Sequence, residues 1–193
     1  MQLQNLSTAL TFVLGGTRSG KSSLAQRLVS EHAGDNVLYI ATLRETPAVL
    51  ADVEMHTRIA HHRASRPTAW RTLVLGEEPL NEIADALATI QPKPAVVLDC
   101  LSLFISGQLF MSEQLPNDIE DAATQLTEHL VQLQRRSQTP WIVVSNEVGL
   151  SVVPESAAGR LYRDALGRAN QVLAREADTV YFVLAGLVQK LKG

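Results

Sequence analysis

The 193-residue sequence contains a single cysteine, Cys100, so it cannot form an internal disulfide framework. Aromatic residues make up only 5% of the chain, and 17 Lys and Arg are outnumbered by 20 Asp and Glu. A net charge of −3 gives no overall positive field to attract nucleic acid or an anionic membrane surface. The composition therefore argues against nucleic-acid binding and favours a reducing compartment.

Two further absences concern secretion and membranes. No uncharged apolar run approaches the roughly 20 residues that a membrane-spanning helix needs. The segment from Met1 to Leu14 contains no Lys or Arg, whereas a secretory signal carries a positively charged region at its start. We therefore expect a cytoplasmic protein without a membrane span.

Short apolar runs alternate with segments of helical periodicity, and no repeat or linker divides the chain. Runs typical of buried strands lie at 11–14, 36–41, 70–75, 95–99, 141–145, 179–184 and 187–191. Helical spacing is found at 23–29, 49–62, 79–90, 119–133 and 156–177. This alternation predicts an α/β fold over residues 1–193, one domain whose mostly parallel sheet carries helices on both faces. Ligands of such sheets bind beyond the carboxyl ends of the strands.

A glycine-rich run follows the first predicted strand and leads into the first predicted helix. It has the G-x-x-x-x-G-K-[ST] spacing of a P-loop and consists of Gly15, Gly16, Thr17, Arg18, Ser19, Gly20, Lys21 and Ser22. We expect Gly15 and Gly20 to adopt positive φ, so that several amide N–H groups converge on one phosphate. Lys21 would reach the β- and γ-phosphates, and the Ser22 hydroxyl would bind Mg²⁺. The run therefore predicts a site for a nucleoside triphosphate.

Asp99 follows four apolar residues of a predicted strand, as the metal-binding Asp of a Walker B strand does. We interpret it as a ligand of the Mg²⁺ hydration shell. The alternative is that Asp99 only caps the following segment.

The histidine pair His61-His62 lies at the end of the helix predicted over 49–62, which would bury Val49, Val53 and Ile59 on one side. Adjacent helical residues point about 100° apart, so at most one of the two histidines can face a ligand. An imidazole that is neutral near pH 7 can attack phosphorus and carry the group as a phosphoramidate, with nearby arginines holding the phosphates. The alternatives are an exposed pair at a helix end or, with His56, a zinc site whose spacing is unfavourable.

Polar residues at helical spacing mark the predicted helix over 156–177: Arg160, Arg163, Asp164, Gly167, Arg168 and Gln171. We interpret this stripe as a solvated face, with phosphate or subunit binding as the alternative. Glu147, after the strand at 141–145, is a candidate for positioning a substrate hydroxyl.

Several segments, taken in order, resemble one enzyme family: GGTRSGKS at 15–22, YIAT at 39–42, RIAHHR at 58–63, RP at 66–67 with WRT at 70–72, LDCL at 98–101, NEVG at 146–149, VPE at 153–155 and RDALGRANQ at 163–171. Together they are similar to the bifunctional adenosylcobinamide kinase/adenosylcobinamide-phosphate guanylyltransferases of cobalamin biosynthesis. The resemblance covers nearly the whole chain after residue 10.

The resemblance implies a RecA-like P-loop fold, a homotrimer, the nucleotides GTP and ATP with Mg²⁺, and a corrinoid substrate. It implies phosphorylation of the adenosylcobinamide hydroxyl, followed by GMP transfer from GTP through a guanylylated His62. The implied nucleotide contacts are residues 15–22, Ala41, Thr42, Leu43, Arg63, Ala64, Ser65, Arg66 and Asp99. Because His62 serves only one of the two steps, we expect segment 43–66 to move toward the P-loop when GTP binds.

Three positions depart from the family pattern: Val74 stands where Glu is common, Gly107 where Asn is frequent and Ser151 where Gly is usual. If that Glu reads the guanine amino group, its loss would weaken purine selectivity here, unless Glu77 or Glu78 serves instead. Two other functions stay open. One is a P-loop small-molecule kinase with no covalent step, and the other is a RecA-like binding module switched by nucleotide.

Overall fold

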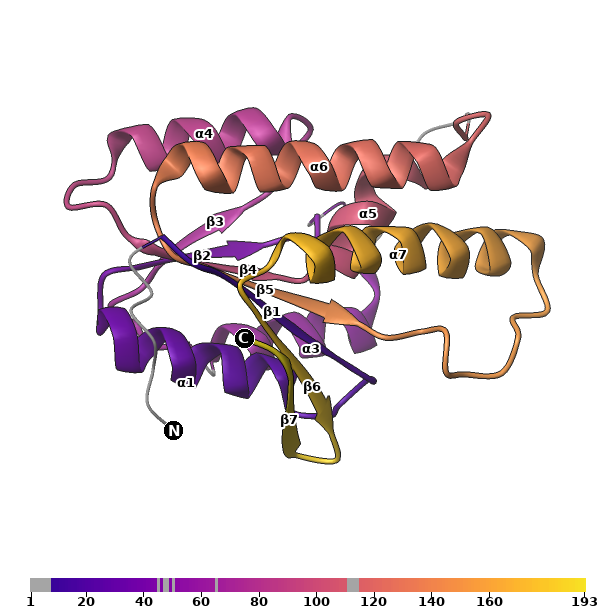
Figure 1. Cartoon of the computed structure of the whole chain (residues 1–193), viewed down its shortest axis with the longest axis horizontal. Coiled ribbons are helices and arrows are strands. Elements are labelled where there is room, and N and C mark those ends of the chain that lie inside the picture. The colour runs from indigo at the N-terminus through magenta and orange to yellow at the C-terminus, as the bar shows by residue number, and fades with distance from the viewer. Residues whose placement is uncertain (1–7, 45, 47–48, 50, 65, 111–114) are drawn as a thin grey trace.

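A computed structural model describes residues 8–44, 46, 49, 51–64, 66–110 and 115–193. Seven strands form one sheet in the order β3-β2-β4-β5-β1-β6-β7 (Figure 1). The strands are β1 (Leu10–Gly15), β2 (Val37–Ala41), β3 (Arg71–Val74), β4 (Ala95–Asp99), β5 (Trp141–Asn146), β6 (Thr179–Leu184) and β7 (Leu187–Lys192). All pairings are parallel except that of β7, which runs antiparallel to β6.

Helices cover both faces of the sheet. They are α1 (Lys21–Ala33), α3 (Val53–Ala64), α4 (Pro79–Thr89), α5 (Leu101–Leu109), α6 (Ile119–Ser137) and α7 (Ala157–Glu176). In Figure 1, α1 and α3 lie below the sheet, and α4, α5, α6 and α7 lie above it. The predicted α/β architecture, a mostly parallel sheet between two helical layers, is therefore confirmed.

The alternation of side chains along the strands divides the core into two layers. On β1, Phe12 packs into the cluster beneath α4 to α7, and its neighbour Val13 packs into the cluster beneath α1. Ile40 and Tyr39 divide in the same way on β2. Because both faces of these strands are covered, their sequences are continuously apolar, which is typical of buried parallel strands.

Two details of the fold differ from the sequence-based expectations. The short helix α5 was not predicted, because its sequence LSLFISGQL is apolar on almost every side and has no helical stripe to recognise. Val53 was expected on a buried side, but it is the first residue of α3 and 79% exposed. The segment around Val49 is described only in part, and the expected loop at 45–47 lies mostly outside the described residues.

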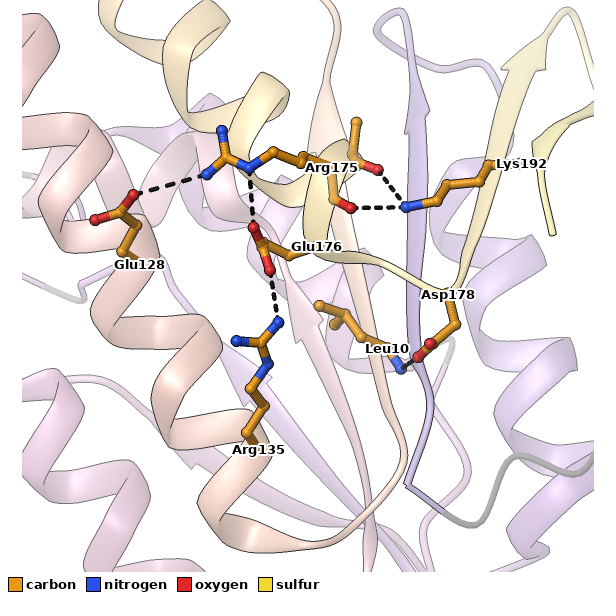
Figure 2. Close-up of polar contacts among 8 residues, drawn as sticks. Leu10, Glu128, Arg135, Arg175, Glu176, Asp178 and Lys192 are labelled. Carbon is orange, nitrogen blue, oxygen red and sulfur yellow. Dashed lines mark hydrogen bonds and ion pairs between the residues drawn. The ribbon is translucent and has the colours of Figure 1, made fainter.

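The amino-terminal edge of the sheet is held by paired charges (Figure 2). The Asp178 carboxylate accepts a hydrogen bond of 2.7 Å from the backbone N–H of Leu10, which joins the starts of β6 and β1. At the ends of α6 and α7, Glu176 forms ion pairs with Arg135 at 2.5 Å and Arg175 at 2.9 Å. The Asp178–Leu10 and Arg135–Glu176 contacts each join distant segments of the chain, so they stabilise the fold at the edge opposite the P-loop.

Within the part of the chain that the structure describes, no helix combines the length and the apolar character needed to span a membrane.

Candidate functional site

The P-loop connects the carboxyl end of β1 to the amino end of α1. Gly20, the residue before α1, has φ of 100°, as the sequence predicted. Gly15 was expected to adopt positive φ as well, and this prediction is wrong, since the second positive φ of the loop belongs to Arg18, at 56°. Glycine is needed at position 15 for a steric reason, because a Cβ atom there would lie 2.2 Å from the backbone oxygen of Val183 on β6.

Two side chains of the loop are buried against its backbone. Lys21 is only 7% exposed, and its Nζ donates a hydrogen bond of 2.6 Å to the carbonyl oxygen of Gly16. Ser19 is 6% exposed, and its hydroxyl is buried without a hydrogen-bond partner among the described residues. Ser22 is half-buried in the first turn of α1. Buried hydroxyls normally have partners, so the unpaired Ser19 hydroxyl, in the loop that leads into the amino end of α1, suits an anionic ligand.

The carboxylate of Asp99 lies at the carboxyl end of β4 and has a partner that sequence reasoning missed. The hydroxyl of Tyr39, on the neighbouring strand β2, donates a hydrogen bond of 2.6 Å to Asp99 Oδ2. Burial, followed by the negative charge of Asp99, raises the pKa of Tyr39 above its usual range, so the phenol remains protonated and is the donor. In the sequence, Tyr39 belongs to the strand predicted at 36–41 and to the family motif YIAT, and neither indicates this contact.

Arg66 packs on the ring of Tyr39, whose hydroxyl binds Asp99. The carbon atom of its guanidinium group lies 3.8 Å from the centroid of the Tyr39 ring, which is a cation–π contact. Its Nε atom is buried and has no hydrogen-bond partner among the described residues. The Trp70 ring also stacks on Tyr39, with a centroid distance of 6.4 Å. The segment that follows α3 is thereby brought to the ends of β2 and β4.

His62 lies near the carboxyl end of α3, four residues before Arg66. Of the α3 side chains that the structure describes, none is buried, and only Ile59 and His62 are half-buried. Residues three apart share one face of a helix, so His62 and Ile59 lie on the side of α3 that turns toward the rest of the protein. The neighbouring Arg63 and Ala64 are exposed, and Ser65 lies outside the described residues.

Thr42, a predicted nucleotide contact, is 3% exposed and joins the ends of two strands. Its hydroxyl donates to the carbonyl oxygen of Cys100 at 2.8 Å and accepts from the Cys100 N–H at 2.7 Å. The side chain is therefore engaged within the fold. Its neighbours Ala41 and Leu43 are half-buried at the same edge of the sheet.

A polar network that the sequence did not reveal lies beside Asp99. Ser102 Oγ lies 2.8 Å from the Cys100 sulfur and accepts a hydrogen bond of 2.8 Å from the Asn146 amide. The Tyr162 hydroxyl, from α7, donates to the Ser102 carbonyl at 3.2 Å, and burial raises the pKa of Tyr162 to about 12. Burial and then the charge of Asp99 raise the pKa of Cys100, so its thiol remains protonated and is a poor nucleophile.

Two other candidates are engaged in contacts within the fold. Both carboxylate oxygens of Glu147 accept hydrogen bonds from loop N–H groups, those of Gly149 at 2.7 Å and Leu150 at 2.9 Å. On the polar stripe of α7, Arg168 pairs with Glu120 of α6 at 2.7 Å. An open groove of about 460 Å³ runs between these two helices. The contacts of Glu147 are those of a side chain that caps its own loop. The contact of Arg168 is that of an exposed helix face.

The three departures from the family pattern lie in different surroundings. Val74 is 37% exposed on β3, which is an edge strand of the sheet. A Cβ atom at Gly107 would contact only the Arg44 side chain, at 3.9 Å. The Ser151 hydroxyl donates to the Val148 carbonyl at 2.7 Å.

The candidate metal ligands Ser22 and Asp99 fit a magnesium ion that is bound mainly through the phosphates of a nucleotide. Among the described residues, no three His, Cys, Asp or Glu side chains lie close enough together to bind a metal by themselves. Mg²⁺ at phosphate sites usually takes only one or two protein oxygens, keeps several waters and binds the phosphates. Asp99 at the end of β4 and Ser22 at the start of α1 offer that kind of ligand.

Comparison with known proteins agrees with this geometry. Residues 11–191 match the family model described as cobinamide kinase / cobinamide phosphate guanyltransferase. The bifunctional adenosylcobalamin biosynthesis protein CobP of Pseudomonas aeruginosa is 41% identical over 181 residues, 94% of this chain and 96% of the relative. The bifunctional protein CobU of Escherichia coli K12 is 36% identical over 190 residues, 95% of this chain and 99% of the relative.

Solved structures with similar folds are more distant in sequence. A KaiC-like protein from Pyrococcus horikoshii superposes with a TM-score of 0.54 at 14% identity, covering 91% of this chain and 71% of the other. A second solved structure, described as an ATPase domain, gives a TM-score of 0.53 at 13% identity, covering 91% and 69%. These likenesses show a RecA-like P-loop fold. The chain therefore belongs to the cobinamide kinase / cobinamide phosphate guanyltransferase family and is a nucleotide-binding enzyme with both of the activities that this family name describes.

Proposed function

We propose that this chain phosphorylates adenosylcobinamide with ATP or GTP and then transfers GMP from GTP to adenosylcobinamide phosphate through a guanylyl group carried on His62. The products of the second reaction are adenosyl-GDP-cobinamide and pyrophosphate. The observation that supports this most is the packing of Arg66 on Tyr39, which brings the segment after His62 to the β2 residue that hydrogen-bonds to Asp99. We also propose that residues 1–193 act as one nucleotide-binding domain.

In this proposal the P-loop holds the triphosphate. Backbone N–H groups of residues 15–22, the Lys21 ammonium group and the Ser19 hydroxyl would donate hydrogen bonds to it. Ser22 and Asp99 would hold Mg²⁺, which neutralises negative charge on the phosphates. Further contacts to the nucleotide would come from Ala41, Thr42, Leu43, Arg63, Ala64, Ser65 and Arg66. Because the Thr42 hydroxyl is hydrogen-bonded to the Cys100 backbone, Thr42 would contact the nucleotide through its own backbone.

The two steps differ in the phosphorus atom that is attacked. In the kinase step the substrate hydroxyl attacks the γ-phosphorus, loses its proton, and the nucleoside diphosphate departs with the electrons of the broken P–O bond. In the guanylyl step an imidazole nitrogen of His62 attacks the α-phosphorus, and pyrophosphate leaves. A phosphate oxygen of adenosylcobinamide phosphate then attacks the same phosphorus, and the P–N bond to His62 breaks.

The attack on two different phosphorus atoms suggests that α3 changes position between the steps. The low burial of the α3 side chains that the structure describes supports such movement, because weakly buried segments open more readily. We expect segment 43–66 to show stronger protection from hydrogen exchange when GTP and Mg²⁺ are added. Unchanged protection in saturating GTP would contradict the movement.

Labelling with α-³²P-GTP tests the covalent step. We expect wild-type protein to acquire an adduct that is labile in acid and stable in base, which is the stability pattern of a phosphoramidate and not of a phosphoester. His62→Ala should abolish the adduct, and the matched control His61→Ala should retain it. Binding of GTP with no adduct in wild-type protein would favour a kinase without a covalent intermediate.

The remaining proposals concern state and partners. We propose a homotrimer, which analytical ultracentrifugation would test, and a cytoplasmic location, in keeping with a sequence that has one cysteine. A nucleotide-switched module that acts on nucleic acid would show salt-sensitive DNA binding. We expect none, because the net charge is −3.

A further inference from the structure

We propose that Tyr39 is a positioning residue for Asp99, and that Arg66 couples the end of α3 to this carboxylate by packing on the Tyr39 ring. This inference rests on the proposed function insofar as it takes Asp99 to be a magnesium ligand and α3 to carry the nucleophile. Its core is a contact between three side chains from separate segments of the chain: β2, β4 and the segment after α3.

The Tyr39 hydroxyl reaches its partner along the neighbouring strand. Tyr39 is opposite Val97 in the parallel register of β2 and β4, and Ala41 is opposite Asp99. The phenol therefore extends past two residues of backbone to reach the carboxylate at the end of β4. The residue is 1% exposed, so its ring is fixed in the core beneath α1, while its hydroxyl lies at the edge where the P-loop also lies.

The hydrogen bond defines the orientation of the carboxylate. An O–H to carboxylate bond of 2.6 Å is charge-assisted, and such bonds are among the stronger ones in proteins. It engages Oδ2 of Asp99 and leaves Oδ1 outside this bond. With one oxygen held by a rigid donor, the other has a defined direction, which favours the near-octahedral geometry that Mg²⁺ demands.

Arg66 contributes from the segment after α3. Its guanidinium carbon lies 3.8 Å from the ring centroid of Tyr39. Tyr39 therefore contacts the Arg66 cation through its ring and the Asp99 carboxylate through its hydroxyl. The backbone N–H of Arg66 also donates to the carbonyl oxygen of Arg63, in the last turn of α3, at 3.2 Å. The Arg66–Tyr39 contact therefore connects the end of α3 to the sheet.

The competing explanation is that Tyr39 only fills the core, where Trp70 stacks on it. A purely structural Tyr39 would tolerate Tyr39→Phe, because phenylalanine keeps the ring and with it the contacts of Arg66 and Trp70. A positioning Tyr39 would not, because the donor to Asp99 is lost.

The experiment measures binding of Mn²⁺, as a probe for magnesium, to the GTP-bound protein by electron paramagnetic resonance. We expect Tyr39→Phe to weaken Mn²⁺ binding about 10-fold, the effect of losing one charge-assisted hydrogen bond. Metal-free GTP binding should stay close to that of wild-type protein, and the melting temperature should fall by only about 2–4 °C, the effect of one lost hydrogen bond. The matched control is Tyr181→Phe, a buried tyrosine of the same cluster on β6, which is three strands from β4 in the sheet.

A second variant separates the two halves of the proposal. Tyr39→Leu removes both ring and hydroxyl, so it should weaken Mn²⁺ binding as Tyr39→Phe does and also increase hydrogen exchange across α3. Tyr39→Phe should leave exchange in α3 unchanged, because Arg66 still packs on the ring.

Two outcomes overturn the inference: Mn²⁺ affinity of Tyr39→Phe equal to that of wild type, or α3 exchange in Tyr39→Leu equal to that of wild type. Failure of the proposed function has a separate readout, the absence of a guanylyl adduct on wild-type protein. An adduct-forming wild type with an unaffected Tyr39→Phe would therefore refute only the inference.

Discussion

The two ends of the parallel strands differ in one respect, whether buried polar atoms without a hydrogen-bond partner are found there. At the amino-terminal edge, the charges of Arg135, Glu176 and Asp178 are all paired with other parts of the chain (Figure 2). At the carboxyl edge, Ser19 Oγ and Arg66 Nε are buried with no hydrogen-bond partner among the described residues. Because an unpaired buried polar group costs stability, the chain retains such groups where a ligand can pair with them. The comparison teaches that, among the described residues, the buried polar atoms without partners gather at the candidate nucleotide site.

The largest expected effect comes from filling the space beside β1. In Gly15→Ala, the added methyl group would meet the Val183 backbone oxygen at 2.2 Å, which no side-chain adjustment can relieve. We expect a loss of about 3 kcal/mol or more in the free energy of unfolding, and no measurable GTP binding. Urea unfolding and isothermal titration calorimetry provide the two measurements.

Gly16→Ala is the matched control for stability. A Cβ atom at Gly16 would have nothing within 4 Å, so we expect its unfolding free energy to change by less than about 1 kcal/mol. Equal destabilisation by the two substitutions would contradict the steric role of Gly15.

Much of the candidate site could be predicted from the sequence because its residues lie close together in the sequence. The P-loop spacing from Gly15 to Ser22, and Asp99 at the end of an apolar strand, depend on short segments with fixed geometry. Strand alternation also predicted which elements form the sheet. These features need no knowledge of how distant segments pack.

The unpredicted features depend on contacts between distant segments. The Tyr39 hydroxyl binds Asp99, 60 residues further along the chain, and the Tyr39 ring contacts Arg66. No periodicity in the sequence predicts these two contacts. The requirement for glycine at position 15 comes from Val183 on a neighbouring strand. Helix α5 was missed because a buried helix has no polar face.

Two single substitutions, one at each edge, should have intermediate effects on stability and on GTP binding. Ser19→Ala deletes a hydroxyl that has no partner in the described structure, so we expect unchanged or slightly increased stability and about 10-fold weaker GTP binding. Asp178→Ala leaves the Leu10 N–H without its carboxylate partner, so we expect a loss of about 1 kcal/mol and unchanged GTP binding.

Thermal unfolding and GTP titration of both variants measure this reciprocal pattern. If Ser19→Ala instead lowered stability and left GTP affinity intact, the distinction between the two edges would be wrong.

The smallest effect concerns pH and the Glu176 ion pairs. The hydrogen bond from Arg175, and then the contact with Arg135, lower the pKa of Glu176 below its unfolded value of about 4.3. A lowered carboxylate pKa contributes stability above the unfolded pKa, and this contribution is lost as pH falls through the folded pKa. Since the arginines are largely exposed, the contribution is at most about 1 kcal/mol.

Urea unfolding of wild-type protein and Glu176→Gln at pH 7 and at acidic pH measures this contribution. We expect the variant to be slightly less stable at pH 7 and to approach wild type as the pH falls below about 4. The same difference at both values of pH would show that Glu176 acts through packing and not through its charge. GTP affinity at pH 7 should be the same for both proteins.

The central claim is that the carboxyl edge of the sheet, with its unpaired Ser19 hydroxyl, holds the nucleotide. A crystal structure of the protein grown with GTP and magnesium tests it most directly. The account predicts the triphosphate within the loop at 15–22, with Ser19 Oγ and Lys21 Nζ within hydrogen-bond distance of phosphate oxygens. Nucleotide bound elsewhere while this loop stays empty would contradict the account.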